Sequence, residues 1–431
     1  MPSVPASSRL VMPRPLKVFW WINASLALLS AVVVVVNRYI LHWGEPYNSP
    51  FLPFHHFCDF WAFHDRFDHY HTLDFYSTTG GSVFSYPAPL SLVYAFFFLA
   101  HHNQHSIFTI VTTLPVIGLG ILLARAMVAR GLPKITASLF VASSLVLSYP
   151  FWFEYLLGNI EICVFLITAV GILAWYRGNL YLAAALIGVA GSMKIFPFVY
   201  LGLFLSRKQY RQFAFGFLTA AVLYPVSIWL ACPSFSVALP QIKASSSAIG
   251  GLLLQWDWVL ANVDHSLFGM YKQFAHLFGY SNIRSAHQLS VYTAIVAIAG
   301  IALYFLRIRR LPLLNQLLSL CIASILLPPM SNDYTLMYLY LPWGLLALST
   351  IQDSRTIGTR PGVLAAFVCF GLLFSPESEI IIRHATLAGQ FKATTLIALL
   401  YIALKYPFSL PFEQTTALPT RTAIADALPV A

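Results

Sequence analysis

The feature that most constrains this sequence is a series of long apolar segments that recur along the whole chain. Three examples are 18–41, 105–124 and 212–231, which contain almost no charged side chains. A helix of about 20 apolar residues crosses the hydrocarbon core of a bilayer, and continuous runs differ from the alternating strands of a membrane barrel. With 58% hydrophobic and 9% charged residues and a mean hydropathy of +0.73, the chain is too apolar for a soluble protein of its size.

We therefore predict an all-α integral membrane protein, a polytopic helical bundle with roughly 11–13 membrane segments. A single domain would occupy 1–410, with long polar outer loops at about 42–86 and 232–286. Residues 411–431 would form a disordered tail. The first apolar run, which starts at Val18, is too long for a signal-peptide core, so we expect a retained first helix.

The net charge of +10 reflects topology rather than nucleic-acid binding, because the basic residues stand at the ends of apolar runs. The positive-inside rule places one set of them in the cytoplasm: Arg125, Arg130, Lys134, Arg177, Arg207, Lys208, Arg211, Arg307, Arg309, Arg310 and Lys405. With the N-terminus also inside, both long loops reach the outer face.

Segment 87–100 must then dip in and return, and 180–205 must be a broken hairpin with Lys194 near its outer apex. Simple alternating crossings would instead place Arg125 to Lys134 outside.

Five scattered cysteines without a CxxC pair argue against a disulfide framework. Charged side chains near a membrane are costly to keep and therefore mark candidate functional sites. Such a group occurs between Phe57 and Pro89, where Asp59, Asp65, Asp68, Asp74 and Arg66 stand among aromatic residues.

A helix over 57–70 would place four aromatic side chains on one side, as in a helix that lies in the membrane interface: Phe60, Phe63, Phe67 and Tyr70. Asp59 would lie at the edge of this stripe, and Arg66 would share its side. A partly buried carboxylate can act as a general base, because burial raises its proton affinity. The alternative is that Asp59 pairs with an arginine and only orients the loop. A metal site is a further alternative, although the acids and histidines of this loop lack a fixed ligand spacing.

Two further groups of polar residues interrupt apolar runs. Asn159 and Glu161 follow Gly158 at the start of one run, where they could cap a helix or line a polar cavity. Lys194 is the strongest single charge inside an apolar segment, and Pro197 follows it as a possible helix break. This lysine could reach a lipid headgroup by extension of its side chain, or it could provide the counter-charge for an anion such as a lipid phosphate.

The motifs, taken in order, resemble glycosyltransferase family 87. They are Asp59-Phe60, then YPAP from Tyr86 to Pro89, LLGNIE, and the glycine-rich run into Lys194-Ile195-Phe196-Pro197. The stretches NVDHSLFG (Asn262 to Gly269) and PPMSNDY (Pro328 to Tyr334) are similar to later motifs of that family. The resemblance implies a GT-C-like bundle that uses a polyprenyl-phosphate-mannose donor. The sequence departs from the family pattern at Asn159, where glutamine is usual, and at Asn332-Asp333-Tyr334, where tryptophan and histidine are usual.

The resemblance also implies roles for individual residues. Asp59 would be the catalytic base, and Lys194 would stabilise the leaving lipid phosphate without a metal or other cofactor. The expected substrate-binding residues are Lys194, Asn159, Glu161, Tyr86, Arg66, His265 and Asp333. The expected partners are the lipid-linked donor, a glycolipid or polysaccharide acceptor and membrane lipids, on the outer face of a bacterial inner membrane. A transporter or flippase of a lipid-linked anion is the competing class, although such proteins usually have two related halves.

Overall fold

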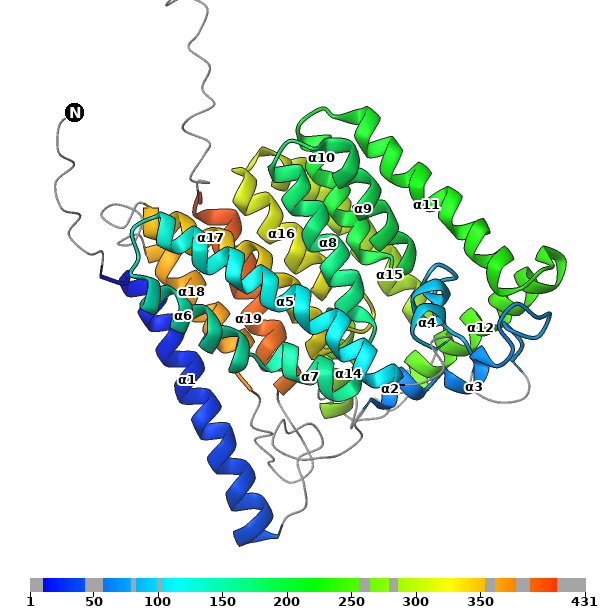
Figure 1. The fold of residues 1–431 in the computed structure, drawn as a ribbon, viewed down its shortest axis with the longest axis horizontal. Coiled ribbons are helices and arrows are strands. Elements are labelled where there is room, and N and C mark those ends of the chain that lie inside the picture. Colours follow the sequence, from blue (N-terminus) through cyan, green and yellow to red (C-terminus); the bar gives the residue numbers. More distant parts are fainter. Residues whose placement is uncertain are drawn as a thin grey trace, which may run out of the picture.

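The computed structural model describes residues 11–42, 57–78, 83–98, 103–255, 264–278, 286–352, 361–376 and 388–408. Every regular element within these ranges is a helix, which confirms the predicted all-α class. Five stretches are long and apolar enough to cross a membrane. They are α1 (Arg14–Val35) continued by the π-helical η1 (Val36–Leu41), α5 (Gln104–Ala129), α11 (Tyr210–Ala231), α15 (Ala286–Leu306) with η3 (Ile308–Arg310), and η4 (Asp333–Leu339) with α17 (Tyr340–Gln352) (Figure 1).

A bent pair of helices, α6 (Lys134–Val146) and α7 (Tyr149–Leu157), forms a sixth candidate span. Its 47° bend falls at Leu147 and Ser148, just before Pro150. Proline lacks a backbone N–H and fits best in the first turn of a helix, which is where Pro150 stands in α7. The expected tail, 411–431, lies outside the described residues.

Shorter helices complete the bundle, and the most buried of them form its centre. These are α8 (Glu161–Tyr176), α9 (Leu180–Met193), η2 (Phe196–Leu201) with α10 (Gly202–Ser206), α16 (Leu313–Leu326), α18 (Pro361–Phe374) and α19 (Ala388–Lys405). Further helices lie at the periphery: α4 (Leu90–Phe98), α12 (Phe235–Gln255) and α14 (Leu267–Leu277). Helix α16 is buried on nearly every side, because it packs between α17, α19 and η2.

The basic clusters meet at one end of the bundle, as the sequence predicts. Arg130 interacts with Tyr176 at the end of α8, and Arg307 donates to the carbonyl of Leu404 at 2.9 Å. Helix α10, which ends at Ser206, packs against η3 (Ile308–Arg310). This end lies at the top of Figure 1, where α10 is labelled. The common location of these residues agrees with the expectation that they lie on one side of the membrane.

The segment that contains Lys194 forms the predicted broken hairpin. Helix α9 runs away from the basic end, Lys194 is extended with φ −142° and ψ 132°, and η2 returns along α9 toward the basic end. A small residue also allows α9 to approach α11: a Cβ on Gly188 would lie 2.2 Å from the carbonyl oxygen of Gly216 in α11. Helices α9 and α11 therefore pack backbone to backbone, as small residues permit in membrane bundles. Helix α4 has nine residues among those described, and residues 99–102 after it lie outside the described ranges, so the dip and return of 87–100 stays a prediction.

The predicted single amphipathic helix over 57–70 is wrong. The chain forms two one-turn helices, α2 (Cys58–Trp61) and α3 (His64–Phe67), separated by a turn. Their aromatic side chains do not lie in lipid: Phe60 is fully buried and Phe67 is 6% exposed, against Phe84, Tyr94 and Phe98. The rings bind the loop to α4 and α5, which gives more burial than a position on the membrane surface.

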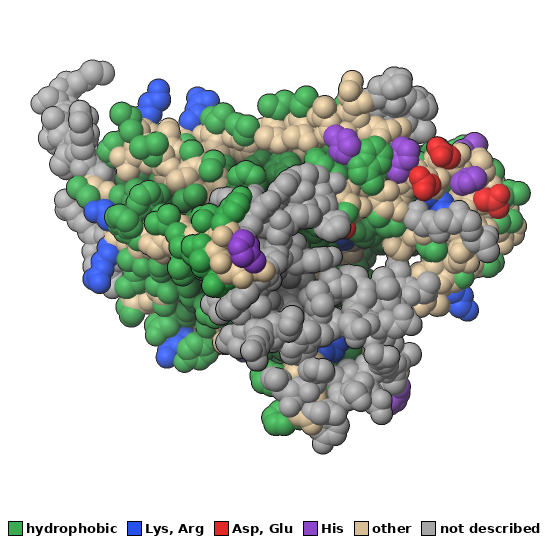
Figure 2. All heavy atoms as spheres, turned by 90° about the horizontal axis from the view of Figure 1, so that it is seen from below, with side chains coloured by type: hydrophobic (Ala, Val, Ile, Leu, Met, Phe, Trp, Pro, Cys, Tyr) green, Lys and Arg blue, Asp and Glu red, His purple; other side chains and the backbone are tan. Residues whose placement is uncertain are grey.

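The acidic side chains of this loop remain exposed. The side chain of Asp65 is 89% exposed, and Asp68 and Asp74 are also exposed. Figure 2, which views the molecule from below Figure 1, shows acidic side chains gathered with histidines at one edge of this face. The acidic loop and the basic end lie at opposite ends of α11, because the His71 amide donates to the carbonyl of Ala231 at the end of this helix, whereas Arg211 stands at its start.

Candidate active site

Asp59 is placed by a close contact between α2 and the turn that joins α7 to α8. The Phe57 amide donates to the carbonyl of Leu156 at 2.8 Å. Gly158 follows with φ +63°, and a Cβ there would lie 2.4 Å from the Phe57 ring and 3.0 Å from the Cβ of Phe60. Only glycine fits this left-handed position under the rings. Gly158 therefore lets the Asp59 helix reach the start of α8.

Asn159 links Asp59 to α8. Its Oδ1 accepts a hydrogen bond from the Glu161 amide at 2.9 Å, and its Nδ2 donates to Oδ2 of Asp59 at 2.8 Å. The backbone N–H can only donate, so the amide orientation of Asn159 is fixed and its NH2 group must face the carboxylate. Asn159 therefore fulfils both alternatives from the sequence analysis: it orders the start of α8, and it also faces the candidate site.

Lys194 and Glu161 form an ion pair at the base of the site. The Nζ of Lys194 lies 2.8 Å from Oε2 of Glu161, and the hydroxyl of Tyr338 donates to Oε1 at 2.6 Å. The Glu161 side chain is fully buried, whereas that of Lys194 is 13% exposed. Two rings flank the ammonium group: its nitrogen lies 4.7 Å from the centroid of Tyr86 and 5.7 Å from that of Tyr334.

The environment of Asp59 suits a general base. Burial raises the pKa of its carboxyl above the ordinary value of 3.8, while the hydrogen bond from Asn159 and the charge of Lys194 act in the opposite direction. The residue itself is half-buried, so its other carboxylate face can meet a ligand. A carboxylate with a raised pKa accepts a proton more readily than an exposed one does.

Five of the eight predicted site residues thus come together: Asp59, Tyr86, Asn159, Glu161 and Lys194. Two further members of the group were not among the predicted site residues: Tyr334 and Tyr338. Tyr334 ends the PPMSNDY motif, so its motif position was available as a signal. Tyr338 stands in an apolar run, and nothing in the sequence distinguishes it from a core residue.

Arg66 is not part of this group, and its expected position on the side of Asp59 is wrong. The turn between α2 and α3 rotates it away, and its Nη1 donates to the carbonyl of Asp74 at 3.2 Å. The side chain is 3% exposed. Arg66 therefore holds the acidic loop together.

His265 and Asp333 form a second polar group with Lys392, which the sequence analysis did not single out. The Nζ of Lys392 lies 2.7 Å from Oδ1 of Asp333, and Nδ1 of His265 lies 3.6 Å from the same oxygen. The Nε2 of His265 lies 3.2 Å from the hydroxyls of both Ser331 and Thr335. His265 and Asp333 are fully buried, and the Lys392 side chain is 2% exposed. We call these three residues the inner cluster.

One short helix connects the two groups. Element η4 carries Asp333 into the inner cluster, whereas its next residue, Tyr334, faces Lys194 and Tyr338 binds Glu161. Asp264 fixes the neighbouring loop, because its Oδ1 accepts from the amides of Ser266 at 2.9 Å and Ser331 at 3.0 Å. Asn262 and Val263 of the same motif lie outside the described residues.

A metal site in the acidic loop would need several ligand side chains close together. In the part of the chain that the structure describes, no three His, Cys, Asp or Glu side chains are grouped so that they could hold a metal ion. The exposed carboxylates of the acidic loop are among the side chains that form no such group.

Comparison with known proteins gives the class. The model of glycosyltransferase family 87 matches residues 84–329, which is more than half of the 431-residue chain. The protein therefore belongs to glycosyltransferase family 87 and is a membrane glycosyltransferase. No curated protein and no solved structure matches the chain. The matched range includes Tyr86, Asn159, Glu161, Lys194 and His265, but it begins after Asp59 and ends before Asp333.

Proposed function

We propose that this protein transfers a sugar, most simply mannose, from a polyprenyl-phosphate donor to a hydroxyl of a glycolipid or glycan acceptor. The observation that carries the proposal is the hydrogen bond between Asn159 and Asp59. It holds a half-buried carboxylate with a raised pKa beside the Lys194–Glu161 ion pair. A base and a cation side by side match the two ends of a displacement at an anomeric carbon.

In the proposed reaction, Asp59 removes the proton from the acceptor hydroxyl as its oxygen attacks the anomeric carbon. The bond from that carbon to the phosphate oxygen breaks, and the electron pair leaves with the lipid phosphate. The sugar is transferred with inversion, because attack and departure occur on opposite faces. Asp59 ends protonated, and the proton passes to water.

Lys194 would stabilise the charge that develops on the phosphate. Glu161 takes one hydrogen bond of the ammonium group, but a lysine has three donors. The pair also holds the cation in one place, so little reorganisation is needed as charge moves. We place the enzyme in a bacterial inner membrane with Asp59 toward the outside, because the acidic loop lies opposite the basic end.

The test is sugar transfer by the purified full-length protein in nanodiscs from radiolabelled polyprenyl-phosphate-mannose to a panel of envelope glycolipids. Asp59→Asn should lower turnover by about 10²- to 10⁴-fold, the usual contribution of a general base, while the donor still binds. Asp65→Asn is the matched control, since it removes the same charge from an exposed position in the same loop and should leave turnover unchanged.

Other outcomes would change the assignment. Equal turnover in wild type and Asp59→Asn would remove Asp59 from the mechanism. Movement of the intact donor across the membrane without transfer to any acceptor would favour the transporter class. Retention of the anomeric configuration in the product would contradict a single displacement.

A further inference from the structure

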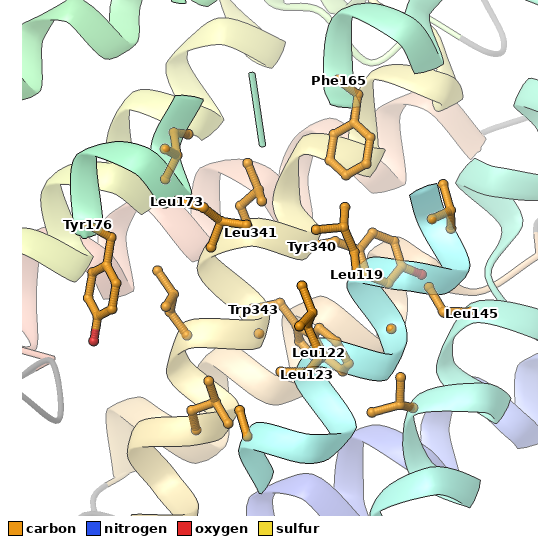
Figure 3. A pocket seen from close by; sticks show the side chains of 18 of the residues that line it. Leu119, Leu122, Leu123, Leu145, Phe165, Leu173, Tyr176, Tyr340, Leu341 and Trp343 are labelled. Atoms are coloured by element: carbon orange, nitrogen blue, oxygen red, sulfur yellow. The ribbon is translucent and has the colours of Figure 1, made fainter. Parts of the chain in front are cut away.

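A half-open cavity lies between helices of the bundle, away from the Asp59 site. It has a volume of about 300 Å³ and is lined by α5, α8 and α17, with contributions from α6 and Phe151. Figure 3 shows the leucines of α5 and α17 that line it, with Phe165 and Tyr176 of α8 apart from one another along its length. This size is at the lower end of the range for small-molecule sites.

Its walls are polar at one end only. The lining residues include Arg130 and Arg177, but no aspartate or glutamate. Tyr176 lies beside Arg130 at the same end. The other tyrosine in the wall, Tyr340, already donates its hydroxyl to the carbonyl of Ser144 at 3.1 Å. The cavity is therefore an apolar space with two arginines at its mouth.

The mouth lies at the basic end of the bundle, far from Lys194. Helix α8 begins with Glu161 in the candidate active site and ends at Tyr176 beside this mouth, and its 16 residues span about 24 Å. A donor whose phosphate lies at Lys194 would thus have its headgroup at the opposite end. The cavity mouth instead faces the leaflet that the basic residues mark as cytoplasmic, and that leaflet is rich in anionic lipids.

We propose that this cavity binds one anionic phospholipid. An acyl chain would occupy the apolar interior, and the phosphate would lie between Arg130 and Arg177. The planar guanidinium group suits phosphate, because its N–H donors can make two parallel hydrogen bonds to the same anion. Arg177 is exposed and Arg130 half-buried, so both can meet a headgroup at the membrane surface. The Nη1 of Arg130 donates to the carbonyl of Ala126 at 2.9 Å, which holds the side chain in place, and a guanidinium group has five N–H donors in all. This site does not depend on the proposed transfer reaction.

The test is native mass spectrometry of the full-length protein with phosphatidylglycerol and phosphatidylcholine that carry identical acyl chains. The wild type should bind phosphatidylglycerol more tightly. Arg130→Gln/Arg177→Gln should lower that affinity by about 30-fold, because two direct hydrogen-bonded contacts to the phosphate are lost, and leave phosphatidylcholine unaffected. Arg211→Gln/Arg310→Gln is the matched control: it removes two exposed arginines from the same end, outside the cavity, where salt screens their charge, and should change neither affinity more than about twofold.

Two more variants address folding and the acyl chain. If the double variant does not fold, the single variant Arg177→Gln takes its place. It changes an exposed residue and should still lower the affinity for phosphatidylglycerol several-fold. Gly344→Leu should lower the affinity for both lipids, because a Cβ at Gly344 meets only Leu123 at 3.6 Å and a longer side chain would enter the cavity.

Three results would overturn the proposal. The wild type could bind both phospholipids equally, which would make the cavity an ordinary lipid-facing groove. The control pair could lose as much affinity as Arg130→Gln/Arg177→Gln, which would indicate a general surface-charge effect. Polyprenyl phosphate could displace phosphatidylglycerol and lose its own binding in Arg130→Gln/Arg177→Gln, which would assign the cavity to the donor.

Discussion

Two lysine–carboxylate pairs lie on either side of η4, and they differ mainly in their access to solvent. Lys194 and Glu161 are 2.8 Å apart, and Lys392 and Asp333 are 2.7 Å apart. The Lys194 side chain is 13% exposed, whereas that of Lys392 is 2% exposed. The first pair adjoins Tyr86 and the half-buried Asp59, and the second is enclosed by His265 and the hydroxyls around it.

The comparison shows that ion-pair distance does not identify an active site. A buried pair is neutral as a unit and can simply join elements, whereas a pair with an accessible third group can act on a ligand. The inner cluster joins the loop at His265, the start of η4 and α19. We therefore interpret it as the support for η4, and the Lys194–Glu161 pair as part of the candidate active site.

Lys392→Met should cause the largest loss of stability, about 3–5 kcal/mol, because it leaves Asp333 charged and unpaired in the interior. Thermal and denaturant unfolding of the detergent-solubilised protein measures it. The double variant Lys392→Met/Asp333→Asn should recover part of the loss, since the carboxylate charge is removed as well. If the double variant is no more stable than the single one, the pair does not support η4 through its charges.

Lys194→Met should reduce sugar transfer by about 10²- to 10³-fold, the usual loss when one group that stabilises developing charge is removed. Its stability loss should be smaller than that of Lys392→Met, because water reaches Lys194 and Glu161 keeps its bond to Tyr338. Turnover and unfolding of one preparation separate the two effects, with the exposed Lys243→Met as the control. Normal turnover in Lys194→Met would contradict its role at the leaving phosphate.

Tyr338→Phe should destabilise the protein by about 1.5–3 kcal/mol, the range for a hydrogen bond to a charged group. The bond at 2.6 Å is made in a fully buried position, so water cannot replace the lost hydroxyl. Tyr210→Phe, at an exposed tyrosine, should have no measurable effect. A stability equal to that of wild type would mean that Glu161 relies on Lys194 alone.

Asn159→Ala should shift the pH profile of transfer without abolishing it. The hydrogen bond from Asn159 lowers the pKa of Asp59, which burial raises, so its removal should move that pKa further upward. Only the ionised carboxylate accepts a proton, and the acidic limb of kcat/KM should therefore move to higher pH. Asp65→Asn should leave the limb in place. Movement of the limb to lower pH would show that the limb belongs to a different group.

The same raised pKa has a consequence for folding. A carboxyl whose pKa is higher in the folded state than in the unfolded state contributes stability at low pH, and this contribution is lost as the pH rises through the folded value. Asp59 therefore weakens the fold slightly when it is ionised, which is the state required for catalysis.

Much of the fold was predictable because membrane helices are specified locally. The length and apolarity of 105–124 and 212–231 predicted α5 and α11, and the basic residues at the ends of such runs predicted one common end. The hairpin at Lys194 was also predictable. The basic residues before and after segment 180–205 can lie on the same side of the membrane only if this segment turns back. The aromatic stripe at 57–70 led to a wrong prediction. Its spacing is compatible both with one helix in lipid and with two helical turns that pack against α4 and α5.

The candidate site was only partly predictable. Asp59 and Lys194 stand out because charge in an apolar context is rare, and the motif order relates them to a family. Lys392 is also a charged residue and Tyr338 carries a polar hydroxyl group, but both lie in apolar runs without a motif. Arg66 stands out in the sequence as much as Lys194, yet it binds the loop at Asp74.

The sequence by itself determined that this chain is a helical membrane protein, which ends of its helices are basic, and which family its motifs follow. These properties depend on residues close together in the chain and on the transfer free energy of apolar groups. The tertiary structure alone decided which polar groups meet: Asp59 and Asn159 are 100 positions apart, and Glu161 and Tyr338 are 177 positions apart. Such contacts depend on how the helices pack, because a buried polar group must find its partner wherever the fold brings one within reach.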